Sequence, residues 1–311
     1  MTKFRQFVQK IEWSNFLFLT LTPLAAIFGT LWVLSHDGGH PFTWMLALLM
    51  MIASGLSVTV GYHRLFSHKT FQATGIIKLF CLLFGGAAFE GSAQEWCSAH
   101  RKHHQFVDTE KDPYNIKKGF WHAHMLWVVL KSDQSDDSNI KDLKRDPLIL
   151  FQNRYYVSLA ILVGFILPAG LTALWGDFWG GVFIAGFLRV VVNHHLTFLI
   201  NSYCHYFGKQ TYSDDHTARD SGFISLFTYG EGYHSFHHTF ESDYRNGVRF
   251  YQWDPSKWTI QLLALLGLAS RLKRAAPEKI LEKRLSIEAK RLRQKRTYGQ
   301  RYPLAATLSK F

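Results

Sequence analysis

Residues 41–68 read PFTWMLALLMMIASGLSVTVGYHRLFSH, an apolar run that leads into two histidines. The apolar part, 41–62, contains no Asp, Glu, Lys or Arg and is long enough to cross a bilayer, which takes about 20 apolar residues. His63 and His68 are about 140° apart on an ideal helix, so we expect them to straddle its end. The stretch therefore predicts a membrane span whose end carries possible metal ligands.

Further stretches are also apolar and long enough to span a membrane: residues 16–34, 155–175 and 178–201. The last contains Arg189, His194 and His195, which would be costly against lipid, so we expect them to face protein or a water-filled cavity. For Arg189, a structural ion pair or a position at the helix end is as good an interpretation as a functional role. The chain is thus expected to be an integral multi-pass membrane protein.

The basic residues indicate how the spans are oriented. The spans form two close pairs, and their connectors, 35–40 and 176–177, contain none of the 35 Lys and Arg residues. The positive-inside rule therefore places both termini and the central segment in the cytoplasm. If the protein is bacterial, the membrane that it spans is expected to be the inner, or plasma, membrane. Because the net charge of +12 follows membrane sidedness, it does not indicate nucleic-acid binding.

The rest of the chain is expected to form a helical cap on the cytoplasmic side. Residues 76–89 and 258–269 are apolar but too short to span comfortably, so they are interpreted as interfacial or core helices. The polar stretch 131–145 is expected as a solvated loop. The predicted fold is one all-α domain over 1–311, with a cap formed by 63–154 and 202–275 and a basic tail at 276–311.

Two more histidine clusters share one spacing, HRKHH at 100–104 and HSFHH at 234–238. On a helix, H-x-x-H-H places its three imidazoles within an arc of about 100°. Eight imidazoles in three clusters exceed the capacity of one ion, so the clusters predict two metals. Asn201 and His205, four residues apart, share a helix face, which makes His205 a ninth candidate ligand and Asn201 a candidate holder of a metal-bound water. Cys97 and Cys204 are better interpreted as packing residues.

These motifs resemble the membrane-bound fatty acyl desaturases of the stearoyl-CoA (delta-9) type, in a bacterial-like form. The resemblance lies in GYHRLFSH, EWCSAHRKHHQFVDTEKDPYNIKKGFWHAHMLW, TFLINSYCHYFG and SDDHTARDSGFISLFTYGEGYHSFHH. It implies two iron ions, with Asn201 acting through water and with nine ligands: His63, His68, His100, His103, His104, His205, His234, His237 and His238. The other histidines match no ligand position of the family: His36, His40, His122, His124, His194, His195 and His216.

The resemblance also implies a reaction. A desaturase uses O2 and two external electrons to introduce a cis double bond, here near carbon 9 of a saturated long acyl chain. Removing hydrogen from unactivated methylenes needs a redox metal, which favours iron over zinc. A membrane hydroxylase is the chemical neighbour, and a non-catalytic metal-binding membrane protein is the alternative from another class.

Matching positions suggest residues that contact the substrate or orient the ligands. The implied substrate contacts are Trp96, Thr197, Phe198 and Glu90; Phe198 replaces a Trp of the animal relatives and Glu90 stands near their kink-lining Gln. An interfacial anchor is the competing interpretation of Trp96. Glu95 and Glu231 are the stronger candidates for orienting imidazole N–H groups, whereas surface salt bridges are the simpler expectation for Asp108 and Asp112.

The carrier of the acyl chain and the electron donor are less well defined. Animal acyl-CoA desaturases have an Arg-Asp pair for the coenzyme A head group where this chain has Ser98 and Ala99. Other cations could bind coenzyme A, namely Lys102, Lys117, Lys118 or Lys131, or the carrier could be a phospholipid or a carrier protein. Electrons are expected from a separate ferredoxin, rubredoxin or cytochrome b5 with its reductase. The basic residues Lys209, Arg245 and Arg249 suggest an acidic donor.

Overall fold

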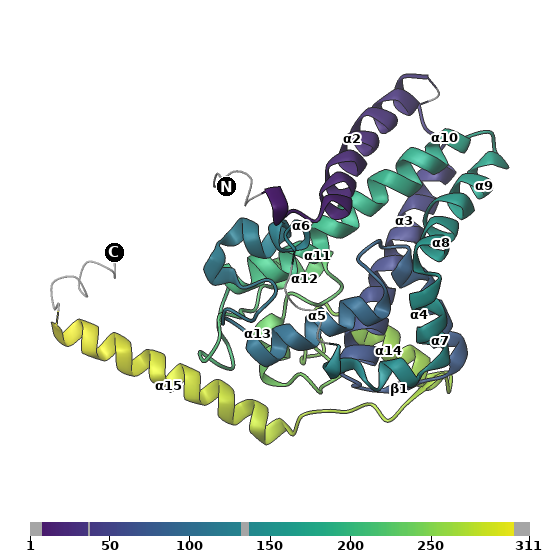
Figure 1. Cartoon of the computed structure of the whole chain (residues 1–311). Helices are drawn as coiled ribbons and strands as arrows, with labels where there is room; N and C mark the ends of the chain where they lie inside the picture. Colours follow the sequence, from purple (N-terminus) through teal and green to yellow (C-terminus); the bar gives the residue numbers. More distant parts are fainter. Residues whose placement is uncertain (1–7, 37, 132–136, 302–311) are drawn as a thin grey trace.

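The computed structural model describes residues 8–36, 38–131 and 137–301. Within these residues, four helical stretches are long and apolar enough to cross a membrane: Trp13–His36, Pro41–Ser67, Tyr156–Ala173 and Phe178–Tyr206. Figure 1 shows them as a stem, with the other helices gathered at one end as a cap. The predicted all-α membrane architecture is confirmed, and the second and fourth spans continue past residues 62 and 201 into the cap.

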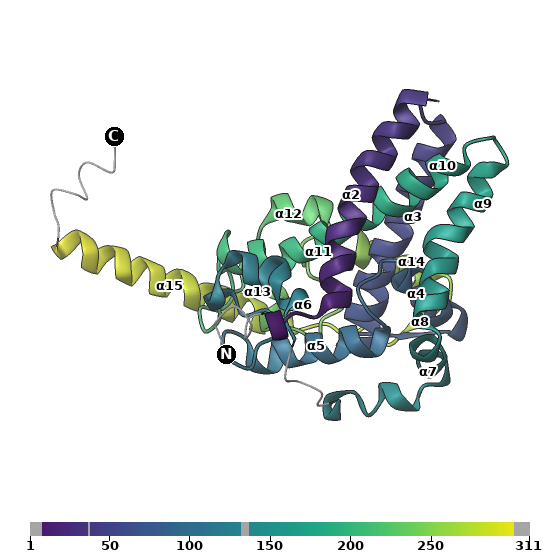
Figure 2. The ribbon, with the colours of Figure 1, turned by 45° about the horizontal axis from the view of Figure 1, so that its top comes forward.

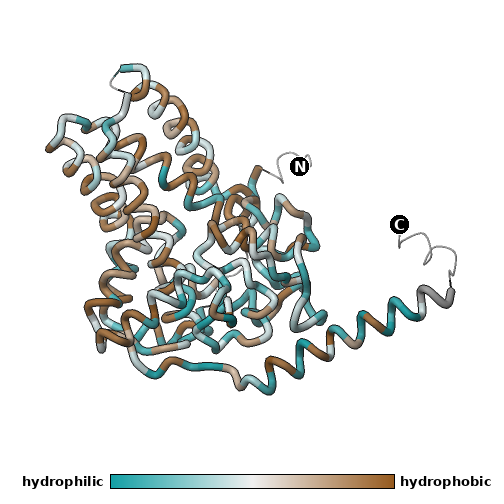
Figure 3. Tube along the Cα trace, turned by 180° about the vertical axis from the view of Figure 1, so that it is seen from behind, coloured by the Kyte–Doolittle hydropathy of each residue, from teal (hydrophilic) through white to brown (hydrophobic). Residues whose placement is uncertain are grey.

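The stem is built from consecutive helical segments. The first span is α2 (Trp13–His36), and the second is α3 (Pro41–Leu56) followed by the π-helix η1 (Ser57–Ser67). The third joins α8 (Tyr156–Ile161), η6 (Leu162–Ile166) and α9 (Leu167–Ala173), and the fourth joins α10 (Phe178–Gly180), η7 (Gly181–Leu188) and α11 (Arg189–Tyr206). In Figure 3 the stem is predominantly apolar along its length.

Large apolar side chains on the stem point away from the protein. On α2, Leu21 is 57% exposed and Phe28 is 67% exposed. A water-soluble fold would bury such residues, so their exposure along a whole helix indicates a lipid-facing surface. The structure therefore fits a multi-pass membrane protein.

The first half of the cap follows the second span. It contains α4 (Gly75–Gly86), α5 (Ala93–Phe106), η2 (Ile116–Lys118), η3 (His122–Leu126), α6 (Trp127–Val129), η4 (Ser138–Ile140), η5 (Leu143–Arg145) and α7 (Pro147–Arg154). Helix α4, from the apolar stretch at 76–89, packs along η1. The loop expected at 131–145 contains two 3-10 turns, and its residues 132–136 lie outside the described residues.

The second half of the cap follows the fourth span. It contains α12 (Gly222–Phe227), α13 (His234–Thr239), α14 (Pro255–Leu265) and the tail helix α15 (Pro277–Arg301). A short antiparallel pair, β1 (Gln72–Ala73) with β2 (Ala269–Ser270), joins the two halves and is a departure from the purely helical expectation. The basic tail thus continues the cap as one long helix.

Arg189 and His194 satisfy backbone carbonyls inside the stem. Arg189 donates to the carbonyls of Ala87 (2.6 Å), Gly164 (3.0 Å) and Ala185 (3.1 Å), and Nε2 of His194 lies 2.8 Å from the carbonyl of Ala88. The carbonyls of Ala87 and Ala88 directly follow α4, at a helix end where carbonyls have no partner within the helix, whereas Gly164 and Ala185 belong to η6 and η7. Both side chains are buried in protein, as expected. Because Arg189 contacts backbone carbonyls, its environment fits a structural role.

His195 differs from that expectation. Its ring is exposed at the surface of α11, and its Nδ1 lies 3.1 Å from Nε2 of His124. Successive residues point in different directions on a helix, so burial of His194 leaves its neighbour facing outward.

Replacing Arg189 by Leu should destabilise the stem. The change leaves three carbonyls without their donor, and hydrogen bonds to charged groups contribute about 1.5–3 kcal/mol each. We expect a clear fall in the thermal unfolding temperature of the protein in detergent. Arg154→Leu, at an exposed arginine at the end of α7, is the control. Equal unfolding temperatures for the two variants would contradict the assigned role.

Candidate metal centre

The second span reaches the site through a π-helix rather than a simple helix end. In η1 the backbone N–H of His68 donates to the carbonyl of His63 at 3.1 Å, a bond between residues five apart. This bonding brings the two rings together, with centroids 4.9 Å apart. His68 is the C-terminal cap of η1, so the pair does lie at the helix end, but on one side of it. Such π-helical turns are frequent at functional sites.

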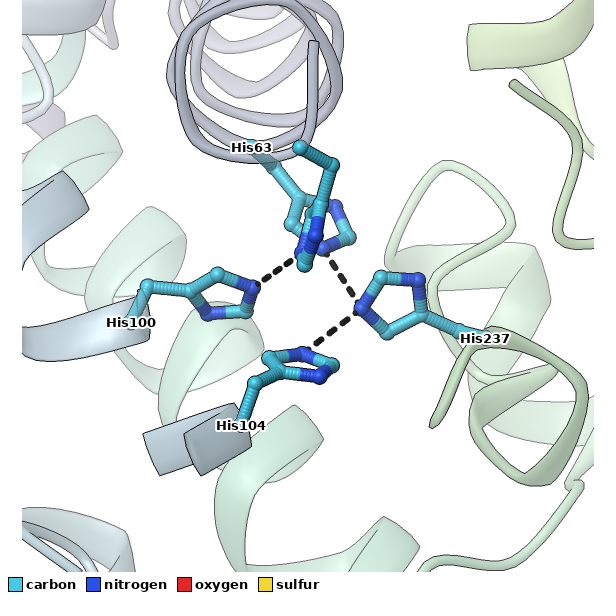
Figure 4. Close-up of side chains that lie close together, drawn as sticks. His63, His100, His104 and His237 are labelled. Carbon is cyan, nitrogen blue, oxygen red and sulfur yellow. Dashed lines mark hydrogen bonds between the residues drawn. The ribbon is translucent and has the colours of Figure 1, made fainter. Parts of the chain in front are cut away.

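The other histidines come from three helices. α5 contributes His100, His103 and His104, α13 contributes His234, His237 and His238, and the end of α11 contributes His205. Figure 4 shows His63 from η1, His100 and His104 from α5, and His237 from α13 pointing at one another. The predicted ligand set is therefore assembled in space.

The nine side chains form two groups. One consists of five histidines and the other of four, and the ligand atoms within each group lie within 4.8 Å of one another. The groups are, first, His63, His68, His100, His104 and His237 and, second, His103, His205, His234 and His238. The closest approaches join Nε2 atoms, at 2.8 Å for His68 and His100 and 3.0 Å for His205 and His234.

Carboxylates at the outer nitrogens explain this arrangement. Nδ1 of His63 lies 2.8 Å from Glu231, Nδ1 of His103 lies 2.8 Å from Asp112, and Nδ1 of His104 lies 3.2 Å from the partly exposed Glu241. A carboxylate only accepts, so each Nδ1 carries the hydrogen and each Nε2 is left with a lone pair. Glu231 therefore lies where it could orient the ring of His63, and this role stays a prediction.

His205 is oriented through an intermediate hydroxyl. Its Nδ1 lies 2.8 Å from Thr217 Oγ1, and that hydroxyl donates to Asp108 at 2.6 Å. Because the threonine hydrogen points to the carboxylate, the hydroxyl oxygen accepts from His205 Nδ1–H. Asp108 and Asp112 thus contact the histidine shell, instead of forming the surface salt bridges that were the simpler expectation.

Converging lone pairs fit metal cations. Burial, followed by the neighbouring imidazoles, lowers the pKa of His100, His234 and His237 well below the usual value, so the rings are neutral. Neutral rings that present Nε2 lone pairs to each other at 3 Å repel unless a cation lies between them. The donor set is all nitrogen and in two groups, which fits two transition-metal ions.

Glu95 does not have the predicted contact with the histidines. Its side chain is exposed and accepts from the backbone N–H of Ser92 at 2.8 Å, while Ser92 Oγ accepts from Glu95 N. This capping box starts α5 and satisfies two of its free N–H groups. Glu95 therefore positions the helix that carries three ligands, and orients no imidazole directly.

Asn201 lies one helical turn before His205 on α11 and is half-buried. The four-histidine group has one imidazole fewer than the other, so a water held by Asn201 would add a ligand there. This role stays a prediction.

Three of the four predicted substrate residues lie together beside the five-histidine group. Trp96 stacks on His100 with ring centroids 4.9 Å apart and donates from Nε1 to Glu90 at 3.2 Å. Thr197 donates to the other oxygen of Glu90 at 2.8 Å. The stacking of Trp96 in the interior weakens its interpretation as an interfacial anchor. Burial raises the pKa of Glu90 to about 7, against the effect of the hydrogen bonds from Thr197 and Trp96.

Phe198 is buried and packs between the rings of His124 and His194, at 5.7 Å from each. It therefore lies on α11 next to Thr197 without joining the Trp96–Glu90 contact.

Two of the lysines that could bind coenzyme A already have partners within the protein. Lys117 donates to the carbonyl of Asp108 at 3.0 Å, and Lys118 pairs with Glu110 at 3.2 Å. Ser98 exchanges hydrogen bonds with Asn139, so its hydroxyl holds the η4 segment.

Comparison with known proteins agrees with this geometry. The fatty acid desaturase family model matches residues 41–261. A probable acyl-CoA desaturase of Schizosaccharomyces pombe is 40% identical over 84% of this chain and 54% of its own length, and acyl-CoA desaturase 1 of Saccharomyces cerevisiae is 37% identical over 93% and 57%. An sn-1 stearoyl-lipid 9-desaturase of Anabaena variabilis is 34% identical over 86% of this chain and 95% of its own length.

The chain spans about half the length of the two yeast relatives but nearly all of the cyanobacterial one. The matched region, 41–261, contains both histidine groups and all their carboxylate partners. The chain belongs to the fatty acid desaturase family.

Proposed function

We propose that the protein is an O2-dependent acyl desaturase that introduces a cis double bond near carbon 9 of a saturated long acyl chain. The observation that carries this proposal is the pair of all-histidine groups with converging Nε2 atoms, directly beside the Trp96–Glu90–Thr197 cluster. Desaturase relatives that act on acyl-CoA and on stearoyl-lipid support it.

Two iron ions held by these histidines would supply the redox chemistry: one O2, two electrons and two protons combine with the two hydrogens removed from the chain to give two waters. Residues of the protein keep that chemistry in place. Glu231, Asp112 and Glu241 fix the Nδ1–H tautomer of three ligands, and Thr217 does so for His205. Held this way, these four imidazoles need no reorientation when metal is bound.

The stem and the cap would contribute differently to substrate binding. The exposed apolar helices place the protein in the bilayer, where saturated acyl chains are present. Trp96 gives a flat apolar wall on the side of the five-histidine group, which would hold a methylene chain against the metals. By the positive-inside rule we propose that both termini and the cap are cytoplasmic, where a soluble electron donor meets the site.

Expression in a host without its own desaturase tests the function. We expect mono-unsaturated fatty acids to appear, and gas chromatography with double-bond location should place the bond. Incubating membranes with radiolabelled stearoyl-CoA, or with labelled phospholipid, identifies the carrier. Hydroxylated product alone, or unchanged lipids in cells whose purified protein contains iron, would contradict the proposal.

Glu90→Gln should change the pH dependence of the activity. A buried carboxyl with a pKa of about 7 contributes most to stability below its ordinary value of 4.5 and loses that contribution as pH rises to about 7. We expect the activity of the purified wild-type protein to fall between pH 6.5 and 8 as Glu90 ionises, and the Gln variant, which is neutral throughout, to show a flatter profile. If the two profiles were parallel, ionisation of Glu90 would not be the cause of the fall in activity. The control is Glu95→Gln, at the exposed cap of α5.

A further inference from the structure

The outer side of the cap carries an open hollow with a basic rim. It has a volume of about 250 Å³ and is lined by Arg245 and Arg249, from the loop after α13, and by Arg284 from α15, with Tyr212 beside them. A second hollow shares Arg245, which is paired with Asp243, and adds Arg274 together with the buried Lys257, whose ammonium donates to the carbonyl of Gly247. The surface that combines the two hollows is called the basic rim below.

Helix α15 adds to this positive charge. It contains nine Lys or Arg and three Glu. Arg291 donates to the carbonyl of Gln210 at 2.5 Å and Lys290 pairs with Asp214, so the helix is anchored beside the loop that carries Tyr212. Arg284 has Glu288 at 3.5 Å, but α15 still has six more Lys or Arg than Glu, so its surface is net positive and would attract an acidic partner.

The basic rim lies close to the metal ligands. The ring of Tyr212 is 5.2 Å from that of Phe236, which is buried and directly precedes His237 of the five-histidine group. The backbone N–H groups of Thr211 and Tyr212 also donate to Ser235 on the same helix. One packed aromatic layer therefore separates the hollow from a ligand.

The position of the rim argues against a lipid partner. Figures 1 and 2 both show α15 leaving the cap on the side away from the outer end of the stem, and Figure 3 shows the apolar stem pointing in another direction. A bilayer around the stem would not reach this side of the cap, whereas a soluble protein would.

We propose that the basic rim is the docking site of a small one-electron carrier protein with an acidic face. The proposal rests on the proposed function, which consumes two electrons per double bond. In each encounter the reduced carrier is oxidised by one electron and the metal centre is reduced by one, so two encounters supply one turnover. With the carrier docked over Tyr212, only the packed rings of Tyr212 and Phe236 would lie between it and His237. Opposite charge would speed its association.

Charge reversal at the rim tests the proposal. The probes are a soluble cytochrome b5 domain and a plant-type ferredoxin, and the protein is the purified full chain loaded with iron. The test variant is Arg249→Glu with Arg284→Glu. The matched control is Lys141→Glu with Lys144→Glu, which makes the same change in net charge at exposed positions in the η4–η5 region.

We expect at least one probe to bind, and its Kd at low salt to rise about tenfold or more for the arginine variant and less than about twofold for the lysine variant. The difference should shrink toward 1 M salt, where the Debye length falls to about 3 Å. Equal weakening by both variants, or no binding of either carrier to the wild-type protein, would overturn the proposal. So would loss of binding to anionic-lipid vesicles with carrier binding unchanged.

A single-turnover assay separates this proposal from the proposed function. The protein is reduced anaerobically with dithionite, freed of reductant and mixed with O2 and acyl substrate. We expect equal product from the wild type and the arginine variant, because dithionite does not need the rim. No product from the wild type would contradict the desaturase assignment, while normal product together with unchanged carrier binding in the arginine variant would contradict the docking site alone.

Discussion

Replacing His234 by Ala should abolish formation of unsaturated product and should lower the bound iron from about two ions per chain to about one. Nε2 of His234 lies 3.0 Å from that of His205 and 3.1 Å from that of His238, so it is central in the four-histidine group. Its removal leaves three imidazoles where the intact group has four, so we expect the ion at this position to be bound much more weakly and to be lost during purification. Iron content by mass spectrometry and product by gas chromatography measure the two effects.

The two groups should respond differently to the loss of one ligand. His104→Ala leaves four imidazoles in the five-histidine group. We therefore expect this variant to retain more iron than His234→Ala while still losing activity. His216→Ala is the control, because its ring lies 5.2 Å from that of His238 yet belongs to neither group. Full activity or two tightly bound ions in His234→Ala would disprove the assignment of this ligand.

The spans and the ligand types could be read from the sequence because both depend on local patterns. An apolar run of sufficient length must be covered by lipid or protein, and clustered histidines have few other uses. The side-by-side placement of His63 and His68 could not be read, since the i to i+5 bonding of η1 is intrinsically poor and depends on the helices packed around it, such as α4 and α5.

The residues that orient the imidazoles were only partly predictable. Glu231 is three residues before His234, but its partner is His63, which lies 168 positions earlier in the chain. Thr217 and Glu241 had no spacing signal, because loops bring them to His205 and His104. The role of Glu95, by contrast, was available in the sequence: Ser92 and Glu95 have the S-x-x-E spacing of a capping box, and the cap satisfies the carboxylate locally.

Replacing Arg64 by Leu should destabilise the protein by about 3–5 kcal/mol, since it breaks a buried ion pair by removing one partner. Arg64 lies 2.8 Å from Glu231 and 3.0 Å from Asp254, and all three side chains are buried. The substitution leaves two carboxylates without their cation. Thermal unfolding in detergent measures the loss, and Lys144→Leu, which breaks an exposed pair with Asp137, should cost at most about 1 kcal/mol.

The pH dependence of unfolding shows whether the charge of Arg64 is the cause. Burial opposes ionisation of Glu231, but His63 and Arg64 hold its pKa at about 2, below the ordinary 4.5. Its contribution to wild-type stability is therefore present above pH 4.5 and is lost as pH falls toward 2. Without Arg64, burial outweighs the remaining attraction and the pKa of Glu231 should rise above its ordinary value. The Leu variant should then lose stability as pH rises from 5 to 7, where the wild type does not, and identical slopes would show that Arg64 acts through packing alone.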